Sequence, residues 1–245
     1  MGGRVASRIA EHGVEVTGDL TGAETLFLVP VRERPDRAAV HAAVVDSAVA
    51  AGVQHIVYLS FLNTSPTATF TLSRDHYATE QHIRGSGIAF TFLRGSAFHE
   101  VAHYLLGPDD VIRGPGGRGR VAFVGKEDVV EVAVTVLLDP YAHADVTYDL
   151  TGPEALSLQE LAELFARTSG RPVTYVEETV EAAYESRAGF GAPQWLLDAW
   201  VSTYLQIANG ELDLVTTDVQ RLLDRIPRSL EGYLTEHPEV LAKHT

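Results

Sequence analysis

The stretch Ala51-Gly-Val-Gln-His-Ile-Val-Tyr-Leu-Ser60 joins the end of a helix to a buried strand. Gly52 ends an alanine- and valine-rich helix over residues 36–51, and residues 55–60 are apolar enough for a strand covered on both faces. Residues 25–31 form a similar apolar run before it. A helix at 74–85 and a strand at 89–94 follow. Strands that alternate with helices predict a parallel sheet with helices on both faces.

The chain changes character beyond Gly107, where the strands become short and helices dominate. We therefore predict an α/β fold, with a Rossmann-like parallel sheet in residues 1–150, pruned at its N-terminal side, and a smaller, mostly helical substrate lobe in residues 151–245. The other predicted elements are helices at 4–12, 97–106, 127–138 and 158–169 (capped by Ser157), strands at 14–16, 121–124, 146–150 and 173–176, and a mainly helical region at 179–241.

The composition excludes several classes of protein. The 245 residues include no cysteine, which rules out disulfides, thiolate catalysis and cysteine-bound zinc. The net charge of −14 argues against nucleic-acid binding, which depends on Lys and Arg. We find no apolar run long enough for a transmembrane helix and no secretory signal, and we expect a cytoplasmic protein with no membrane partner.

Four segments carry a family resemblance, in order and spacing. They are 51–60, quoted above, Phe70-Thr-Leu-Ser-Arg-Asp-His-Tyr-Ala-Thr-Glu80, Ile88-Ala-Phe-Thr-Phe-Leu-Arg94 and Tyr148-Asp-Leu-Thr-Gly-Pro-Glu-Ala-Leu156. Together they resemble the NmrA-like branch of the atypical short-chain dehydrogenase/reductases (SDR). That branch contains NAD(P)H-dependent quinone and triphenylmethane-dye reductases and non-catalytic redox sensors. The resemblance implies a Rossmann core whose small-molecule pocket lies at the carboxyl ends of the strands, under a C-terminal lobe.

The N-terminal half departs from the family pattern in two places. Relatives begin with a strand and a Gly-x-x-Gly-x-x-Gly loop, whereas this sequence opens with Met1-Gly2-Gly3 and a helix. Only about a dozen residues separate Gly13 from Thr25, where relatives have two strands and a helix. A phosphate cradle needs backbone N–H groups at a helix N-terminus behind such a loop. We therefore expect no cofactor, with NAD(P)H as the alternative held only by remnant contacts at Val29, Pro30 and Val31.

A literal Gly-x-Gly-x-x-Gly pattern occurs elsewhere, at Gly114, Gly116 and Gly119. The pattern binds a dinucleotide only where a strand precedes it and a helix follows it. Here a strand is predicted to follow. We interpret these glycines as a turn.

Three residues are candidates for catalysis in the predicted pocket. Ser60 ends a central strand, and His76 titrates near neutral pH and suits acid/base work. Tyr77 is able to donate a hydrogen bond to a carbonyl. Neither lysine of the chain follows a tyrosine at the Tyr-x-x-x-Lys spacing of the superfamily, and Leu72 stands at the tyrosine position. In the alternative interpretation Asp75 caps the helix and Glu80 pairs with Arg84.

The predicted substrate pocket contains Phe98, His99, His103, Trp195 and Trp200. His99-Glu100-Val-Ala-His103 matches the His-Glu-x-x-His pattern, which places two zinc ligands on one face of an α-helix. We predict no metal, because no third ligand is evident at a suitable spacing. The two tryptophans are either core residues or aromatic walls against a substrate.

These observations leave three functions open. The leading hypothesis is an enzyme that has lost NAD(P)H binding and performs acid/base chemistry, such as isomerisation, cyclisation or elimination, on an aromatic or polyketide-like small molecule. The second is an NAD(P)H-dependent, quinone-reductase-like oxidoreductase. The third is a non-catalytic ligand sensor. We expect a small-molecule substrate as the partner, and the sequence leaves open whether the chain forms a homodimer.

Overall fold

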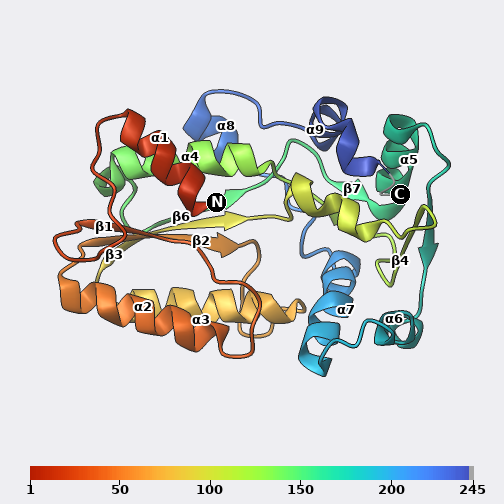
Figure 1. Cartoon of the computed structure of the whole chain (residues 1–245), viewed down its shortest axis with the longest axis horizontal. Coiled ribbons are helices and arrows are strands. Elements are labelled where there is room, and N and C mark those ends of the chain that lie inside the picture. The colour runs from red at the N-terminus through yellow and green to blue at the C-terminus, as the bar shows by residue number, and fades with distance from the viewer. Residues whose placement is uncertain (243–245) are drawn as a thin grey trace.

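A four-stranded parallel sheet forms the centre of the computed structural model, which describes residues 1–242 (Figure 1). Its strand order is β1-β2-β3-β6. β2 is buried along nearly its whole length, as its apolar sequence predicts. The strands are β1 (Thr25–Leu28), β2 (His55–Phe61), β3 (Ala89–Gly95) and β6 (Val146–Leu150).

Helices cover both faces of the sheet (Figure 1). α2 (Arg37–Ala51) and α3 (Thr71–Ser86) lie on one face, and α1 (Gly2–Glu11), α4 (Lys126–Leu138) and α8 (Asp218–Leu223) lie on the other. Successive side chains of a strand point to opposite faces. Accordingly, Ile56 and Tyr58 pack toward α2 and α3, whereas Val57 and Leu59 pack toward α4. This three-layer arrangement confirms the predicted α/β fold with a Rossmann-like parallel sheet.

A second group of elements lies beyond the carboxyl end of the sheet. Its two small sheets pair β4 with β8 and β5 with β7, so each joins segments from both sides of the predicted boundary at residue 150. The division into two domains there stays a prediction. The elements are β4 (Val111–Gly114), β5 (Arg120–Val121), β7 (Leu156–Ser157), α5 (Leu158–Ser169), β8 (Thr174–Glu177), α6 (Val180–Ala188), α7 (Gln194–Ala208) and α9 (Leu230–Glu236), with the 3₁₀ helices η1 (His99–Leu105) and η3 (Pro238–Leu241). A further 3₁₀ helix, η2 (Pro140–His143), precedes β6 at the amino end of the central sheet.

Local structure differs from the sequence prediction at three segments. Residues 14–16 form no strand: they pair with no neighbouring strand, and Val14 and Val16 stay exposed. The helix predicted over 97–106 is the 3₁₀ helix η1, limited by β-bridges at Phe98 and Leu106. The strand predicted over 121–124 shortens to β5. The predicted cap of α5 is confirmed, since Ser157 and Glu160 form a capping box. No helix within residues 1–242 is long and apolar enough to cross a membrane.

The glycines of the Gly-x-Gly-x-x-Gly pattern form the turn between β4 and β5, and a strand follows them as predicted. Each lies against a neighbouring element with no room for a side chain. A Cβ atom on Gly119 would lie 1.7 Å from the carbonyl oxygen of Ile207 in α7, and one on Gly114 would lie 2.2 Å from the ring of Tyr204. The pattern therefore serves close packing, with Gly114 and Gly119 against α7 and Gly116 against Leu158 of α5.

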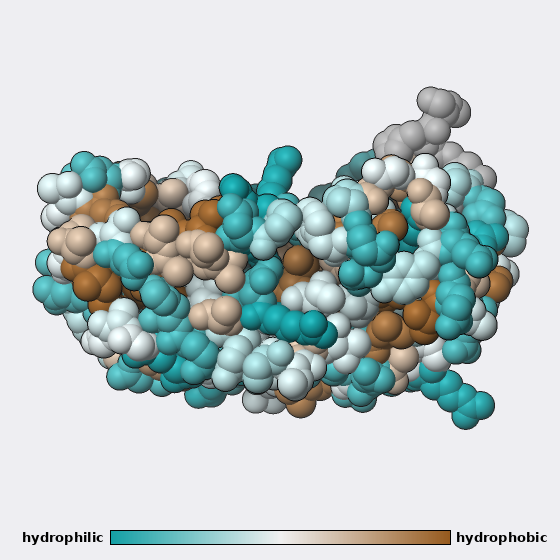
Figure 2. Space-filling model, turned by 90° about the horizontal axis from the view of Figure 1, so that it is seen from below, coloured by the Kyte–Doolittle hydropathy of each residue, from teal (hydrophilic) through white to brown (hydrophobic). Residues whose placement is uncertain are grey.

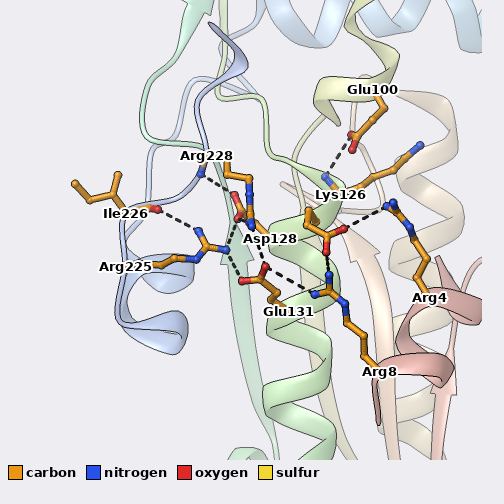
Figure 3. A network of polar contacts seen from close by, with 10 residues as sticks. Arg4, Arg8, Glu100, Lys126, Asp128, Glu131, Arg225, Ile226 and Arg228 are labelled. Carbon is orange, nitrogen blue, oxygen red and sulfur yellow. Dashed lines mark hydrogen bonds and ion pairs between the residues drawn. The ribbon is translucent and has the colours of Figure 1, made fainter. Parts of the chain in front are cut away.

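The first turn of α4 carries a network of ion pairs (Figure 3). The buried carboxylate of Asp128 accepts hydrogen bonds from Arg225, at 2.7 Å, and from the backbone N–H of Arg228, at 2.8 Å. The Arg228 guanidinium also contacts Asp128. On the other side of α4, Arg4 and Arg8 of α1 pair with Glu127. This network ties α1 and the segment after α8 to the central layer.

Candidate functional site

A cavity of about 320 Å³ lies at the carboxyl ends of β1, β2 and β3. This is the position at which open parallel sheets bind their ligands, because the connecting loops diverge there. Five of the predicted site residues line it: Ser60 and His76 of the catalytic candidates, Phe98 of the substrate pocket, and Val29 and Pro30 of the cofactor remnant. The lining residues are Met1, Val29, Pro30, Glu33, Arg37, Leu59, Ser60, Phe61, Phe70, Leu72, His76, Gly95, Phe98 and Lys126.

Ser60 is held in place by a fully buried carboxylate. Its hydroxyl donates to Glu80 Oε1 at 2.6 Å. Arg94 donates to the same carboxylate through Nε at 2.9 Å and Nη2 at 2.6 Å, in a bidentate pair. The predicted Glu80–Arg84 pair is thus wrong, and Arg84 instead lies over the rings of Phe90 and Phe92. Because the Ser60 proton points at Glu80, the hydroxyl oxygen has lone pairs available to accept a hydrogen bond.

His76 is buried, and both of its ring nitrogens have partners. Arg37 can only donate, so Nε2 accepts from it at 3.2 Å, and Nδ1 donates to the hydroxyl of Tyr58 at 2.9 Å. Burial, followed by the charges of Arg37 and His41, lowers the pKa of His76 well below its usual value. The imidazole is therefore neutral and already engaged. Its predicted catalytic role stays a prediction, and the geometry suits it to positioning.

The loop after β1 is clamped by two residues of α2 that sequence reasoning missed. The Val31 N–H donates to His41 Nε2 at 3.1 Å, and Arg37 Nε donates to the Val31 carbonyl at 3.1 Å. His41 Nδ1 must then carry the proton that it shares with Thr79 Oγ1 at 2.9 Å. Arg37 and His41 lie four residues apart in the first two turns of α2, among alanines and valines, and this spacing was the available signal. The predicted cap is also wrong: α3 begins at Thr71, and Asp75 lies inside it.

The burial of His41 predicts a pH-dependent stability. Burial, assisted by the charge of Arg37, lowers the pKa of His41 from 6.5 to about 4. The unfolded chain therefore takes up this proton at a higher pH than the folded chain, so the stabilisation is complete above pH 6.5 and falls as the pH drops toward 4. Between pH 7 and pH 5, protonation of this one group in the unfolded chain lowers the free energy of unfolding by about 2 kcal/mol.

The measurement is urea unfolding of the wild-type chain and of His41→Gln at both pH values. We expect the fall in unfolding free energy to be shallower in the variant by that amount, whatever its absolute stability. Equal falls in the two proteins would contradict the assignment.

The other predicted site residues do not converge on this cavity. Tyr77 is half-buried and outside it, and Trp195 lines neither this cavity nor the larger one described below. His99 is buried, points its Nε2 at the Phe123 carbonyl at 3.1 Å, and has a pKa lowered to about 4 by burial. His99 and His103 lie on a 3₁₀ helix with three residues per turn, so they do not share a face as they would on an α-helix. Among residues 1–242 no group of three or more metal-binding side chains is present.

A larger cavity, of about 910 Å³, lies between η1, α6 and α7 in the C-terminal part. It contains Trp200, and the ring of Phe190 packs edge-on against that tryptophan. Figure 2, which views the molecule from the side of α2 and α3, shows hydrophilic and hydrophobic residues mixed over this face, with a hydrophobic patch also toward the C-terminal part. The predicted substrate residues are thus divided between two cavities, Phe98 in the first and Trp200 in the second.

The N-terminus of α1 lies beside the first cavity, which Met1 lines. A Cβ atom on Gly2 would lie 3.6 Å from Val29 Cγ2, in the loop after β1. The first turn has no acidic residue, and no side chain caps it. Free N–H groups at a helix N-terminus suit a phosphate, so this arrangement fits the phosphate end of a nicotinamide nucleotide.

The sheet order and the covering helices define a Rossmann-type α/β protein, with a cavity at the edge where such sheets bind their ligands. Residues 15–234 match the NmrA-like family. The chain belongs to this family, as the four sequence segments predicted.

Several relatives have been characterised further. The NAD(P)H azoreductase of Xenophilus azovorans is 31% identical over 224 residues, which are 89% of this chain and 77% of the relative. The NADPH-dependent quinone oxidoreductase of Escherichia coli, solved with NADPH, superimposes with a TM-score of 0.80 at 28% identity, covering 90% of this chain and 78% of that one. The triphenylmethane reductase of Citrobacter sp., solved with NADP(H), gives 0.78 at 25% identity and covers 94% and 86%.

These comparisons overturn two predictions. The leading hypothesis of cofactor-independent acid/base chemistry and the expectation of no cofactor are both wrong, because these relatives are NAD(P)H-dependent reductases. Both predictions equated the missing strand and loop with the loss of the whole phosphate cradle. The fold shows why that was too strong: α1 still points its N-terminus into the ligand-binding edge of the sheet.

Proposed function

We propose that this protein is an NAD(P)H-dependent reductase of a small aromatic or quinone-like acceptor. The observation that carries the proposal is the cavity at the carboxyl ends of β1, β2 and β3, open to the free N-terminus of α1. The names of the relatives support the same reaction class. The cavity volume of about 320 Å³ lies within the range of small-molecule sites.

The residues around the cavity have separable tasks. The N–H groups at the start of α1 would hold a phosphate, and the clamped loop 29–31 would form a rigid wall for the nicotinamide nucleotide. Ser60, oriented by Glu80, presents its oxygen as an acceptor for an amide N–H. When bound, the reduced nicotinamide supplies a hydride.

Aromatic side chains favour a flat acceptor. Phe61 and Phe70 pack together with ring centroids 5.3 Å apart, and Phe98 adds a third ring to the cavity wall. Aromatic faces stack on planar π-systems and exclude water from the reacting centre. His76, neutral and engaged on both nitrogens, holds this wall together with Tyr58 and Arg37.

The test is the acceptor-dependent loss of reduced-nicotinamide absorbance with NADPH or NADH, using menadione and an azo dye as acceptors. We expect turnover, and we expect Ser60→Ala to lower kcat/KM about tenfold, the effect of one hydrogen bond to a bound ligand. Ser47→Ala is the matched control, because Ser47 is exposed on α2 and bonds only within its own helix. Absence of both turnover and calorimetric binding of either nucleotide would overturn the proposal. Binding without turnover would favour a sensor.

A further inference from the structure

The floor of the cavity contains a buried cation without a counter-charge. Arg37 is only 7% exposed and lines the cavity. Its three hydrogen bonds go to neutral groups, namely the Val31 carbonyl, His76 Nε2 and, at 3.5 Å, the Leu72 carbonyl. A guanidinium has five N–H donors, so donors remain for a ligand.

No carboxylate of residues 1–242 forms an ion pair with Arg37. Asp75 interacts with Arg37 electrostatically but forms no ion pair with it. Burial raises the pKa of Asp75, and this effect is larger than the lowering caused by the charge of Arg37. Glu33 lines the cavity but is an exposed residue at its rim, where water screens its charge. Buried charges are costly unless an opposite charge neutralises them, so the site is incomplete without an anion.

A second cation approaches the cavity from the other face of the sheet. Lys126 begins α4, which covers the face opposite α2, and its ammonium lies 5.7 Å from the centroid of the Phe98 ring. Glu100 accepts from the backbone N–H of Lys126 and not from its ammonium (Figure 3). Within the described part of the chain the ammonium has no carboxylate partner. Two cations therefore border a small apolar-walled space in a chain whose net charge is −14.

We propose that Arg37 and Lys126 select an acceptor that carries an acidic group, such as a sulfonate, a carboxylate or an ionised enol. The inference rests on the proposed function and adds the substrate class. Arg37 would donate hydrogen bonds to the acidic group at the floor of the cavity, and the Lys126 ammonium would attract the same negative charge from the opposite side. Since the chain as a whole repels anions, the preference must come from this local pair and will be screened by salt.

The test uses two redox-inert probes of similar shape, naphthalene-2-sulfonate and its neutral sulfonamide, titrated calorimetrically into the protein saturated with NADP⁺ and into the nucleotide-free protein. We expect wild type to prefer the sulfonate by about tenfold or more, as for a charged hydrogen-bonded contact. Arg37→Gln and Lys126→Gln should each remove most of that preference. Arg32→Gln removes the same charge from an exposed position outside the cavity and should retain it.

The outcomes separate this inference from the proposed function. Equal affinity for the two probes in both wild-type titrations would overturn the inference, even if the enzyme oxidises NADPH. A sulfonate preference that NADP⁺ abolishes would also overturn it, because the anion would then be a phosphate of the cofactor. If Arg37→Gln fails to fold, Lys126→Gln decides the matter alone, and an unchanged preference there would sink the assignment. A sulfonate preference would stand even if no acceptor were reduced.

Discussion

Gly119→Ala is expected to lower the free energy of unfolding by at least about 3 kcal/mol, at the upper end of what overpacking costs. The Cβ atom would lie 1.7 Å from the Ile207 carbonyl oxygen and 2.3 Å from its carbon. These are backbone atoms of α7, so no side-chain rotation relieves the overlap. Either the turn between β4 and β5 or α7 must move. Urea unfolding followed by circular dichroism measures the loss.

The matched control is Gly85→Ala. Gly85 lies inside α3 with nothing within 4 Å of the added carbon. Alanine is the better helix former, so we expect a gain of about 0.5–1 kcal/mol. A Gly→Ala substitution is thus expected to lower the free energy of unfolding at position 119 and to raise it at position 85. A Gly119→Ala protein as stable as wild type would show that this turn is not packed against α7 as described.

Asp128→Ala is expected to destabilise the protein by about 3 kcal/mol, because it breaks a buried ion pair on one side only. The carboxylate is fully buried and serves the guanidinium groups of Arg225 and Arg228 as well as the backbone N–H of Arg228 (Figure 3). Each arginine keeps a contact with Glu131 and is at least one third exposed. We therefore place the cost at the lower end of the usual range. Equilibrium unfolding in urea measures it.

Asp46→Ala provides the contrast. Asp46 pairs with His82 on the surface, where both side chains are largely exposed. Surface pairs of this kind contribute less than about 1 kcal/mol. If Asp128→Ala costs no more than Asp46→Ala, then the network around α4 does not attach the segment after α8 to the core.

Much of the fold was predictable because it depends on patterns within short segments. The apolar runs around Phe27, Val57 and Phe92 predicted three neighbouring parallel strands, and Ser157 with Glu160 predicted the start of α5. The presence and length of short strands were less predictable. Residues 14–16 have strand-like side chains, but a strand forms only where a neighbour completes its hydrogen bonds.

The site was predictable in part. Ser60, His76 and Phe98 follow or face the carboxyl ends of strands, and the structure brings them to one cavity. The partners that define their chemistry come from distant segments. Arg37 reaches His76 across 39 positions, and Arg94 reaches Glu80 across 14, so no local spacing indicates either contact. His99 and Trp200 lie outside this cavity, since His99 points at the Phe123 carbonyl and Trp200 lines the larger cavity.

By itself, the sequence determined the alternation of strands and helices, the cap of α5 and the family, since these depend on side-chain polarity and backbone preference over a few residues. Only the tertiary structure decided which charges are neutralised. It buried Arg37 without a carboxylate, left both ring nitrogens of His76 engaged and turned the N-terminus of α1 toward the cavity. The reason is physical: desolvation and charge pairing depend on what packs around a group in space, and residues far apart in the chain supply those neighbours.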